Sequence, residues 1–136
     1  MSEQVSDRST LTPAAEPKTI LLVDDEQSVR SIILKILRRA NYTVLEADGG
    51  AAAVALAESH PGRIDLVISD LYMPGLHGPA VAEKLAASRP GLKVLFISGY
   101  ADTDLVGRSG VPSGANFLQK PFSTQDLTAA VEAAMV

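Results

Sequence analysis

Short β-rich runs alternate with amphipathic helical stretches along this chain, and no other feature restricts its fold as strongly. The predicted strands are residues 19–24, 43–47, 66–70, 93–98 and 116–120. Such alternation indicates an α/β fold with a parallel sheet. The first, third and fourth runs are continuously apolar, as in inner strands, whereas the second and fifth contain Glu46 and Gln119 and belong at the edges. Right-handed crossovers then favour a three-layer, doubly wound, five-stranded parallel sheet in the order 2-1-3-4-5.

Apolar residues at helical spacing mark the segments between the strands. One helix face is formed by Val29, Ile32, Ile33, Ile36 and Leu37. Residues 127–135 repeat this spacing, and Ser123 with Asp126 predicts a capping box before them. The alanine-rich residues 49–59 predict a second helix, and Pro79 fits the start of a third. Residues 102–114 contain glycines and a proline, so a fourth helix of only about two turns is expected there.

The chain of 136 residues has the length of one domain. Its first 17 residues lack strand or helix periodicity, and their Ser, Thr, Glu, Pro and Ala content predicts a flexible tail. Residues 18–136 are expected to form a single folded domain. Because no further segment follows the last predicted helix, we expect a regulator without an output domain.

Composition excludes several classes of function. The net charge of -4, without a basic stripe, disfavours nucleic-acid binding. The chain contains no cysteine, and its polar N-terminus does not resemble a secretory signal. No apolar run approaches the ~20 residues of a membrane span. A cytoplasmic protein that binds other proteins, without contact to a membrane, is therefore expected.

Reactive groups follow four of the predicted strands at the same end. Asp24 and Asp25 follow the first, Asp70 ends the third, Ser98 ends the fourth and Lys120 ends the fifth. The carboxyl ends of parallel strands form one rim, where ligands bind. Crowded carboxylates need a cation to stay ionised, and Mg²⁺ accepts one or two carboxylates while leaving coordination positions for phosphate oxygens.

Each of these groups also has an interpretation without chemistry. Asp25 would cap the following helix, Asp70 and Ser98 would begin turns, and Lys120 would be a solvated surface charge. Four separate strand ends rarely supply two acids, a hydroxyl and an ammonium by chance. The joint placement therefore favours a functional site.

Four segments, in order, resemble a known family. They read ILLVDDE (20–26), DLVISDLYMPG (65–75), VLFISGY (94–100) and FLQKPF (117–122). Together they resemble the receiver domains of response regulators and hybrid histidine kinases. The sequences of the last two segments are most similar to those of hybrid-kinase receivers. The resemblance implies a flavodoxin-like fold and a two-component signalling role: the chain would accept a phosphoryl group from a phosphohistidine and switch partner binding, without being an enzyme.

The resemblance also implies site residues. Asp70 would accept the phosphoryl group, and Asp25 and Asp70 would ligate Mg²⁺, with Mn²⁺ as the alternative ion. Asp24 would act through metal-bound water, and the Tyr72 backbone carbonyl would complete the coordination. Lys120 would pair with a phosphoryl oxygen.

A switch and a cis peptide bond are implied beside that centre. Ser98 would donate its hydroxyl to the phosphoryl group, and the aromatic Phe117 would enter the space that Ser98 vacates. The Lys120–Pro121 bond would be cis and would aim the lysine into the site.

Access of water to the phosphoryl group would depend on three residues. Tyr72 and Tyr100 would flank the approach, and Gly99, where alanine is commoner in the family, keeps it open. Neither tyrosine carries a carboxylate or amide that would orient an attacking water. The alternative is that both rings simply lie on the surface. If they shield the site instead, a long-lived phosphoryl group is expected.

The implied partners are a histidine kinase, a histidine phosphotransfer protein or both, and a weak homodimer is compatible with the sequence. The chain would then be a diffusible regulator, a relay shuttle or a phosphate sink. The alternative is an aspartate-nucleophile, Mg²⁺-dependent phosphohydrolase of the haloacid-dehalogenase type, which needs a second Asp where this chain has Tyr72. A flavin- or nucleotide-binding module shares the fold, but residues 24–26 would repel its phosphate.

Overall fold

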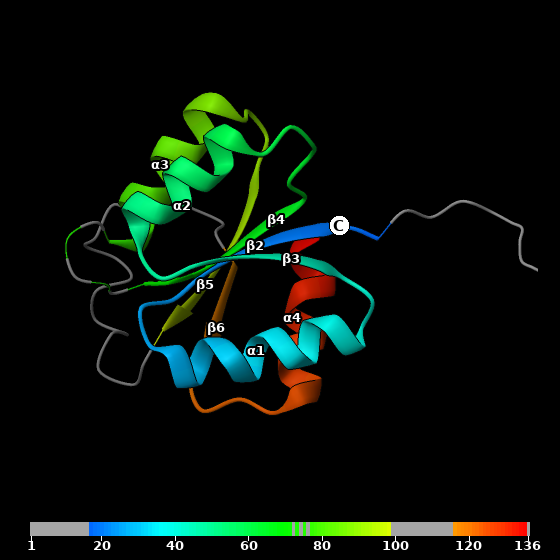
Figure 1. Ribbon diagram of the computed structural model, residues 1–136. Helices are drawn as coiled ribbons and strands as arrows, with labels where there is room; N and C mark the ends of the chain where they lie inside the picture. Colours follow the sequence, from blue (N-terminus) through cyan, green and yellow to red (C-terminus); the bar gives the residue numbers. More distant parts are fainter. Residues whose placement is uncertain (1–16, 72, 74, 76, 99–115, 136) are drawn as a thin grey trace, which may run out of the picture.

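A five-stranded parallel sheet forms the middle layer of the protein (Figure 1). The computed structural model describes residues 17–71, 73, 75, 77–98 and 116–135. The strands are β2 (Thr19–Val23), β3 (Thr43–Ala47), β4 (Leu66–Asp70), β5 (Lys93–Ser98) and β6 (Asn116–Gln119). Their order across the sheet is β3-β2-β4-β5-β6, and all neighbours are parallel. Since this is the order 2-1-3-4-5 along the chain, the predicted doubly wound topology is confirmed.

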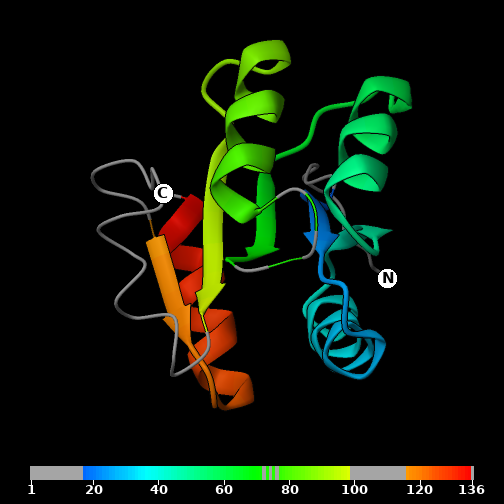
Figure 2. The same cartoon turned by 90° about the vertical axis from the view of Figure 1, so that its left-hand side faces the viewer.

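Among the described residues, two pairs of helices cover the sheet. They are α1 (Gln27–Arg39), α2 (Gly50–Ser59), α3 (Gly78–Ser88) and α4 (Thr124–Met135). Helices α1 and α4 lie on one face, and α2 and α3 lie on the other (Figures 1 and 2). The short helix expected within residues 102–114 and the N-terminal tail lie outside the described residues. None of the described helices is long and apolar enough to cross a bilayer.

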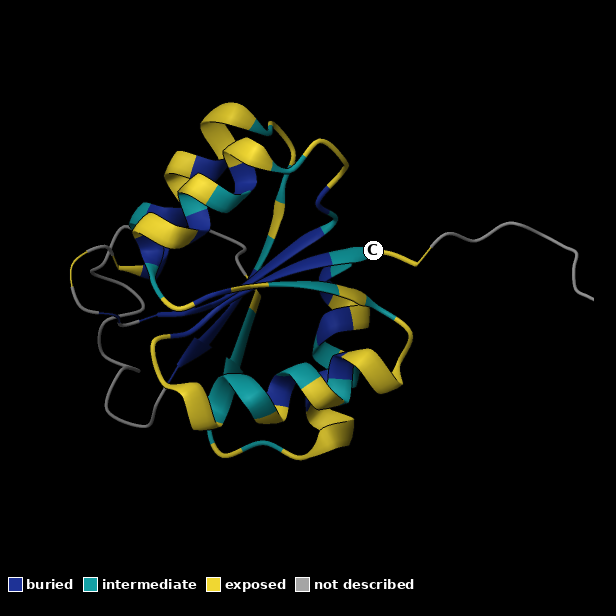
Figure 3. Cartoon of the chain, viewed as in Figure 1, coloured by how far each residue is buried: buried dark blue, intermediate teal, exposed yellow. Residues whose placement is uncertain are grey.

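The inner strands are buried on both faces because helices cover both (Figure 3). Along β2, Ile20 and Leu22 pack with α1 and α4, whereas Leu21 and Val23 pack with α2 and α3. All four side chains are inaccessible to solvent. Full burial of each such side chain contributes about 1.5–3 kcal/mol, so the continuous apolar runs are the main source of the sheet's stability.

The starts of helices α4 and α1 test two interpretations of the sequence, the capping box at Ser123 and the helix cap at Asp25. Ser123 and Asp126 form the predicted capping box: each backbone amide donates to the other side chain at 3.0 Å. Helix α1 instead has Glu26 at its N-cap position, without a side-chain cap. The interpretation of Asp25 as a helix cap is therefore wrong, and its carboxylate is available for other contacts.

Strand register brings the reactive residues to one rim. Val23 pairs with Ser69, so Asp24 follows β2 at the level where Asp70 ends β4. Asp70 pairs with Ile97, and Ser98 pairs with Gln119, after which Lys120 follows. The four predicted strand ends thus reach the same edge of the sheet.

Candidate functional site

Three carboxylates meet at this rim. One side-chain oxygen from each of Asp24, Asp25 and Asp70 lies within 4.8 Å of the others. Asp24 and Asp70 are only 1% and 8% exposed, whereas Asp25 is exposed. Ionised carboxylates this close repel one another, and a set of carboxylate oxygens is what a hard divalent cation prefers. The cluster expected from the strand ends is therefore present.

Asp24 is the most deeply buried member of the cluster. Its Oδ1 accepts a hydrogen bond of 2.8 Å from the Glu26 amide, while its Oδ2 is buried without a hydrogen-bond partner among the described residues. Burial raises the pKa of the Asp24 carboxyl above its usual value. The Glu26 amide and the charge of Lys120 oppose this rise, and the charges of Asp25 and Glu26 add to it. Such an oxygen costs about 1–3 kcal/mol when unsatisfied, so this donor set fits a cation or its bound water.

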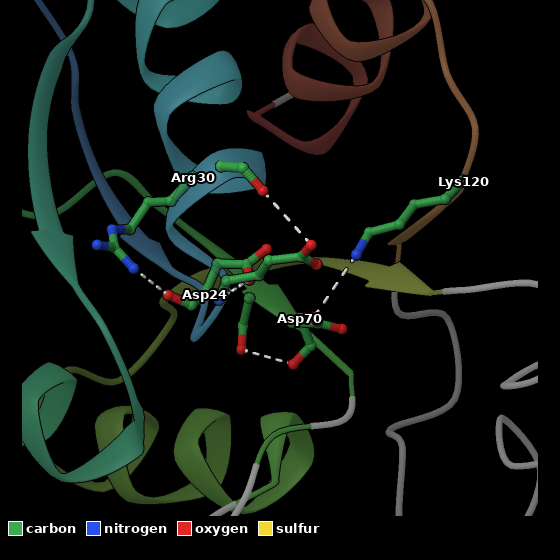
Figure 4. A network of polar contacts seen from close by, with 7 residues as sticks. Asp24, Arg30, Asp70 and Lys120 are labelled. Carbon is green, nitrogen blue, oxygen red and sulfur yellow. Dashed lines mark hydrogen bonds and ion pairs between the residues drawn. The ribbon is translucent and has the colours of Figure 1, made fainter.

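Arg30 fixes the loop that carries the first two carboxylates. Its Nη1 donates to the Asp24 backbone carbonyl at 2.6 Å (Figure 4). Its Nε lies 3.3 Å from Glu46 Oε1 on β3. The Asp24 amide in turn donates to the Ala47 carbonyl at 3.1 Å. Sequence reasoning did not identify Arg30, because its contact with Glu46 depends on how α1 packs beside β3.

Lys120 approaches the cluster from the end of β6 (Figure 4). Its Nζ lies 3.7 Å from Asp70 Oδ2, and its backbone amide donates to the Ser98 carbonyl at 2.9 Å. The Lys120–Pro121 peptide bond is cis, which is the geometry that the resemblance implied. The ammonium group therefore faces the carboxylate at the end of β4 from across β5.

Ser98 and Phe117 lie on neighbouring strands beside Asp70. Ser98 is buried and ends β5, one residue beyond the partner of Asp70 in the sheet. The half-buried ring of Phe117 stacks on the buried ring of Phe96, with centroids 5.6 Å apart. This packing was not anticipated, because it depends on the register of β5 and β6. The switch assigned to Ser98 and Phe117 stays a prediction.

Three of the candidate site residues cannot be placed. Tyr72, Gly99 and Tyr100 lie outside the described residues. The Tyr72 carbonyl as a metal ligand and the two rings as a shield of the phosphoryl group therefore stay predictions.

Comparisons with known proteins agree with this fold. The model of the response regulator receiver domain family matches residues 20–132. The chain therefore belongs to the family of response regulator receiver domains, which is a family of two-component signalling proteins.

Two curated relatives from Brucella abortus (strain 2308) differ greatly in length. Sensor kinase CckA is 37% identical over 114 residues, which cover 84% of this chain and 12% of that protein. Response regulator receiver protein CpdR is 34% identical over 119 residues, which cover 88% of this chain and 98% of that protein. The chain is thus similar to a small part of the first relative and to nearly the whole of the second.

Solved structures give the same result. The crystal structure of the receiver domain of hybrid histidine kinase CckA is 36% identical, with a TM-score of 0.71, and the match covers 87% of this chain and 99% of that one. A response regulator receiver protein from Sinorhizobium medicae WSM419 is 29% identical, with a TM-score of 0.78 over 88% of this chain and 95% of that one.

Proposed function

We propose that Asp70 accepts a phosphoryl group from a phosphohistidine of a partner protein and that the modified chain then changes its binding partners. The observation that carries this proposal is the position of the Asp70 carboxylate. It lies between the carboxylates of Asp24 and Asp25 and the ammonium of Lys120, which is 3.7 Å away. A nucleophile held between a cation site and a fixed positive charge is suited to attack on a phosphoryl group.

Asp24, Asp25 and Asp70 would hold Mg²⁺, or Mn²⁺ in its place. When bound, the ion supplies positive charge that neutralises the oxygens of the transferring group. The protein's own contribution is position and charge. A carboxylate oxygen of Asp70 attacks phosphorus, the new O–P bond forms as the N–P bond to histidine breaks, and the imidazole nitrogen leaves with the electron pair. Lys120 stabilises the negative charge on a phosphoryl oxygen throughout.

The product is an acyl phosphate on Asp70, and its oxygens require new hydrogen-bond donors. The position of Ser98, one residue beyond the partner of Asp70 on the neighbouring strand, supports its hydroxyl as one of these donors. Phe117 would then shift along the β5 and β6 surface into the space that Ser98 leaves. Charge-assisted hydrogen bonds of this kind supply the few kcal/mol that separate two states of a switch.

The proposed partners are histidine kinases or histidine phosphotransfer proteins. The similarity to a sensor kinase and to a response regulator receiver protein supports them. The chain would act as a signalling switch, with transfer to and loss from Asp70 as its own chemistry.

A phosphotransfer assay with two matched variants tests this proposal. A panel of histidine kinases and histidine phosphotransfer proteins, labelled on histidine, is mixed with the wild type, Asp70→Asn and Asp48→Asn in the presence of Mg²⁺. Asp48 is an exposed carboxylate at the end of the neighbouring strand β3, outside the acidic cluster. Label should reach the wild type and Asp48→Asn but not Asp70→Asn. Stoichiometric labelling of Asp70→Asn on another residue would refute the assignment.

A further inference from the structure

Gly78, the first residue of α3, lies against the main chain of Asp70. A Cβ atom at Gly78 would lie 2.5 Å from the Asp70 carbonyl oxygen and 3.1 Å from the Leu71 Cα. The Gly78 amide also donates to the Leu71 carbonyl at 3.2 Å. Among the described glycines, Gly75 and Gly91 have positive φ and Gly78 does not. The close approach to Asp70, rather than the backbone conformation, therefore requires glycine here.

Other groups hold the same peptide unit. The hydroxyl of the buried Ser69 donates to the Asp70 carbonyl at 3.0 Å, and the Leu71 amide donates to the Ile97 carbonyl at 2.9 Å. The peptide between Asp70 and Leu71 is thus fixed by β4, by β5 and by the first turn of α3. This peptide begins at the Cα atom that carries the Asp70 carboxylate.

Helix α3 cannot withdraw freely from this contact. Its buried residues Pro79, Val81, Ala82 and Leu85 are packed in the interior. Real Cβ atoms essentially never approach another heavy atom within 3.0 Å, so a side chain at Gly78 would have to open the contact by at least 3.0 − 2.5 = 0.5 Å. Part of that shift falls on Asp70, and reactive groups generally need to be held within about 0.5 Å of their productive geometry.

We propose that Gly78 is a positioning residue for the phosphoacceptor. It acts through the Asp70 main chain and sets where the carboxylate lies relative to Asp25 and Lys120, without touching the phosphoryl group. This inference rests on the proposed function of Asp70.

The test compares two Gly→Ala variants of the full chain, both at helix starts. Gly78→Ala introduces the clash, whereas Gly49→Ala, at the N-cap of α2, places its Cβ where no atom lies within 4 Å. Acetyl phosphate is the phosphodonor, and both it and Mg²⁺ are saturating. The rate of phosphorylation is measured at a temperature well below the unfolding midpoint of each variant and is corrected for the folded fraction. The maximal rate should fall about tenfold or more in Gly78→Ala and stay within about twofold of the wild type in Gly49→Ala.

A purely structural role would lower the unfolding midpoint of Gly78→Ala and leave its corrected maximal rate at the wild-type value. That result would overturn the inference. If Gly78→Ala does not fold, the phosphorylation rate of Ser69→Ala replaces it as the test. This variant removes a hydrogen-bond donor to the Asp70 carbonyl without adding volume. Its rate should then fall about fivefold, and a wild-type rate would overturn the inference.

The outcomes for Gly78 and for the proposed function are separable. If the wild type takes no label, the function of Asp70 itself is refuted. If the wild type is labelled, Asp70→Asn is not, and Gly78→Ala is labelled at the wild-type rate, only the positioning role is refuted.

Discussion

Lys120 Nζ lies 3.7 Å from Asp70 Oδ2, and this contact joins the end of β6 to the end of β4 across β5 (Figure 4). Lys120 thus places a positive charge against the Asp70 carboxylate, and the same charge acts to lower the pKa of Asp24. Three negative charges and one positive charge sum to −3 + 1 = −2. A divalent cation would neutralise this remainder, so lysine and metal are expected to act together on a phosphoryl group rather than to replace one another.

Replacement of Lys120 should separate metal binding from phosphoryl transfer. Lys120→Met removes the charge that stabilises a phosphoryl oxygen, so the rate with acetyl phosphate at saturating Mg²⁺ should fall about 10²-fold. The Mg²⁺ affinity of Lys120→Met should equal or exceed that of the wild type, because the variant lacks the lysine charge that competes with the ion. Lys84→Met, an exposed lysine on α3, is the matched control and should change neither quantity. A Lys120→Met protein that loses Mg²⁺ affinity but keeps its rate would contradict this role.

Mg²⁺ affinity should depend on Asp25. The side chain is exposed, so its removal is expected to leave folding intact while taking one carboxylate from the cluster. Asp25→Ala should weaken Mg²⁺ binding at least about tenfold, which corresponds to ~1.4 kcal/mol. Calorimetric titration measures this, with Asp48→Ala as the control at the end of β3. Equal dissociation constants for Asp25→Ala and the wild type would remove Asp25 from the metal site.

The buried carboxyl of Asp24 should make metal-free stability depend on pH. Burial raises the pKa of Asp24 in the folded state above its value in the unfolded chain. Over the pH interval between these two pKa values, the folded chain therefore binds more protons than the unfolded chain. Stability therefore falls as pH rises through the interval and stays lower at neutral pH. Asp24→Asn lacks this loss and can still accept the Glu26 amide. The free energy of unfolding of Asp24→Asn should exceed that of the wild type by about 1–3 kcal/mol at pH 7 without Mg²⁺.

Urea unfolding over a pH series in a chelator measures this difference. The gap between Asp24→Asn and the wild type should shrink as pH falls toward the ordinary range of an aspartic acid. Mg²⁺ at 100 times its dissociation constant should stabilise the wild type by about 2.7 kcal/mol, and the same concentration should stabilise the variant less. A wild type that is the more stable protein at pH 7 in chelator would contradict the cost assigned to this carboxyl.

The strands were predictable because their apolar runs depend on local sequence. β3, β4 and β5 have the predicted bounds, and β2 and β6 each end one residue earlier than predicted. The order of the sheet followed from the burial of three runs and from the handedness of crossovers. Asp24, Asp25, Asp70 and Lys120 could be brought together on the same grounds, since each stands at a strand end.

Contacts that depend on packing between elements could not be predicted in this way. The sequence around Arg30 does not indicate that this residue pairs with Glu46. The ion pair forms because α1 lies beside β3. Gly78 reads as an ordinary helix start before Pro79, and only the distance to Asp70 shows why it must lack a side chain. Arg30 and Gly78 meet the site at backbone carbonyls, those of Asp24 and Asp70, and such contacts carry no signal in the sequence.

Arg30 should affect Mg²⁺ binding although it is not a ligand. Its Nη1 donates to the carbonyl of the Asp24–Asp25 peptide at 2.6 Å, so it orients the peptide from which the Asp25 side chain departs. Arg30→Met should weaken Mg²⁺ binding about fivefold, on the scale of one hydrogen bond to a charged donor. Arg30→Lys should restore part of the affinity, because an ammonium can reach either the carbonyl or Glu46 but not both in the same geometry. Arg38→Met, at an exposed position of the same helix, serves as the control for loss of positive charge. If Arg30→Met and Arg38→Met bind Mg²⁺ equally well in titrations, the arginine stabilises the helix and the strand without setting the position of the loop.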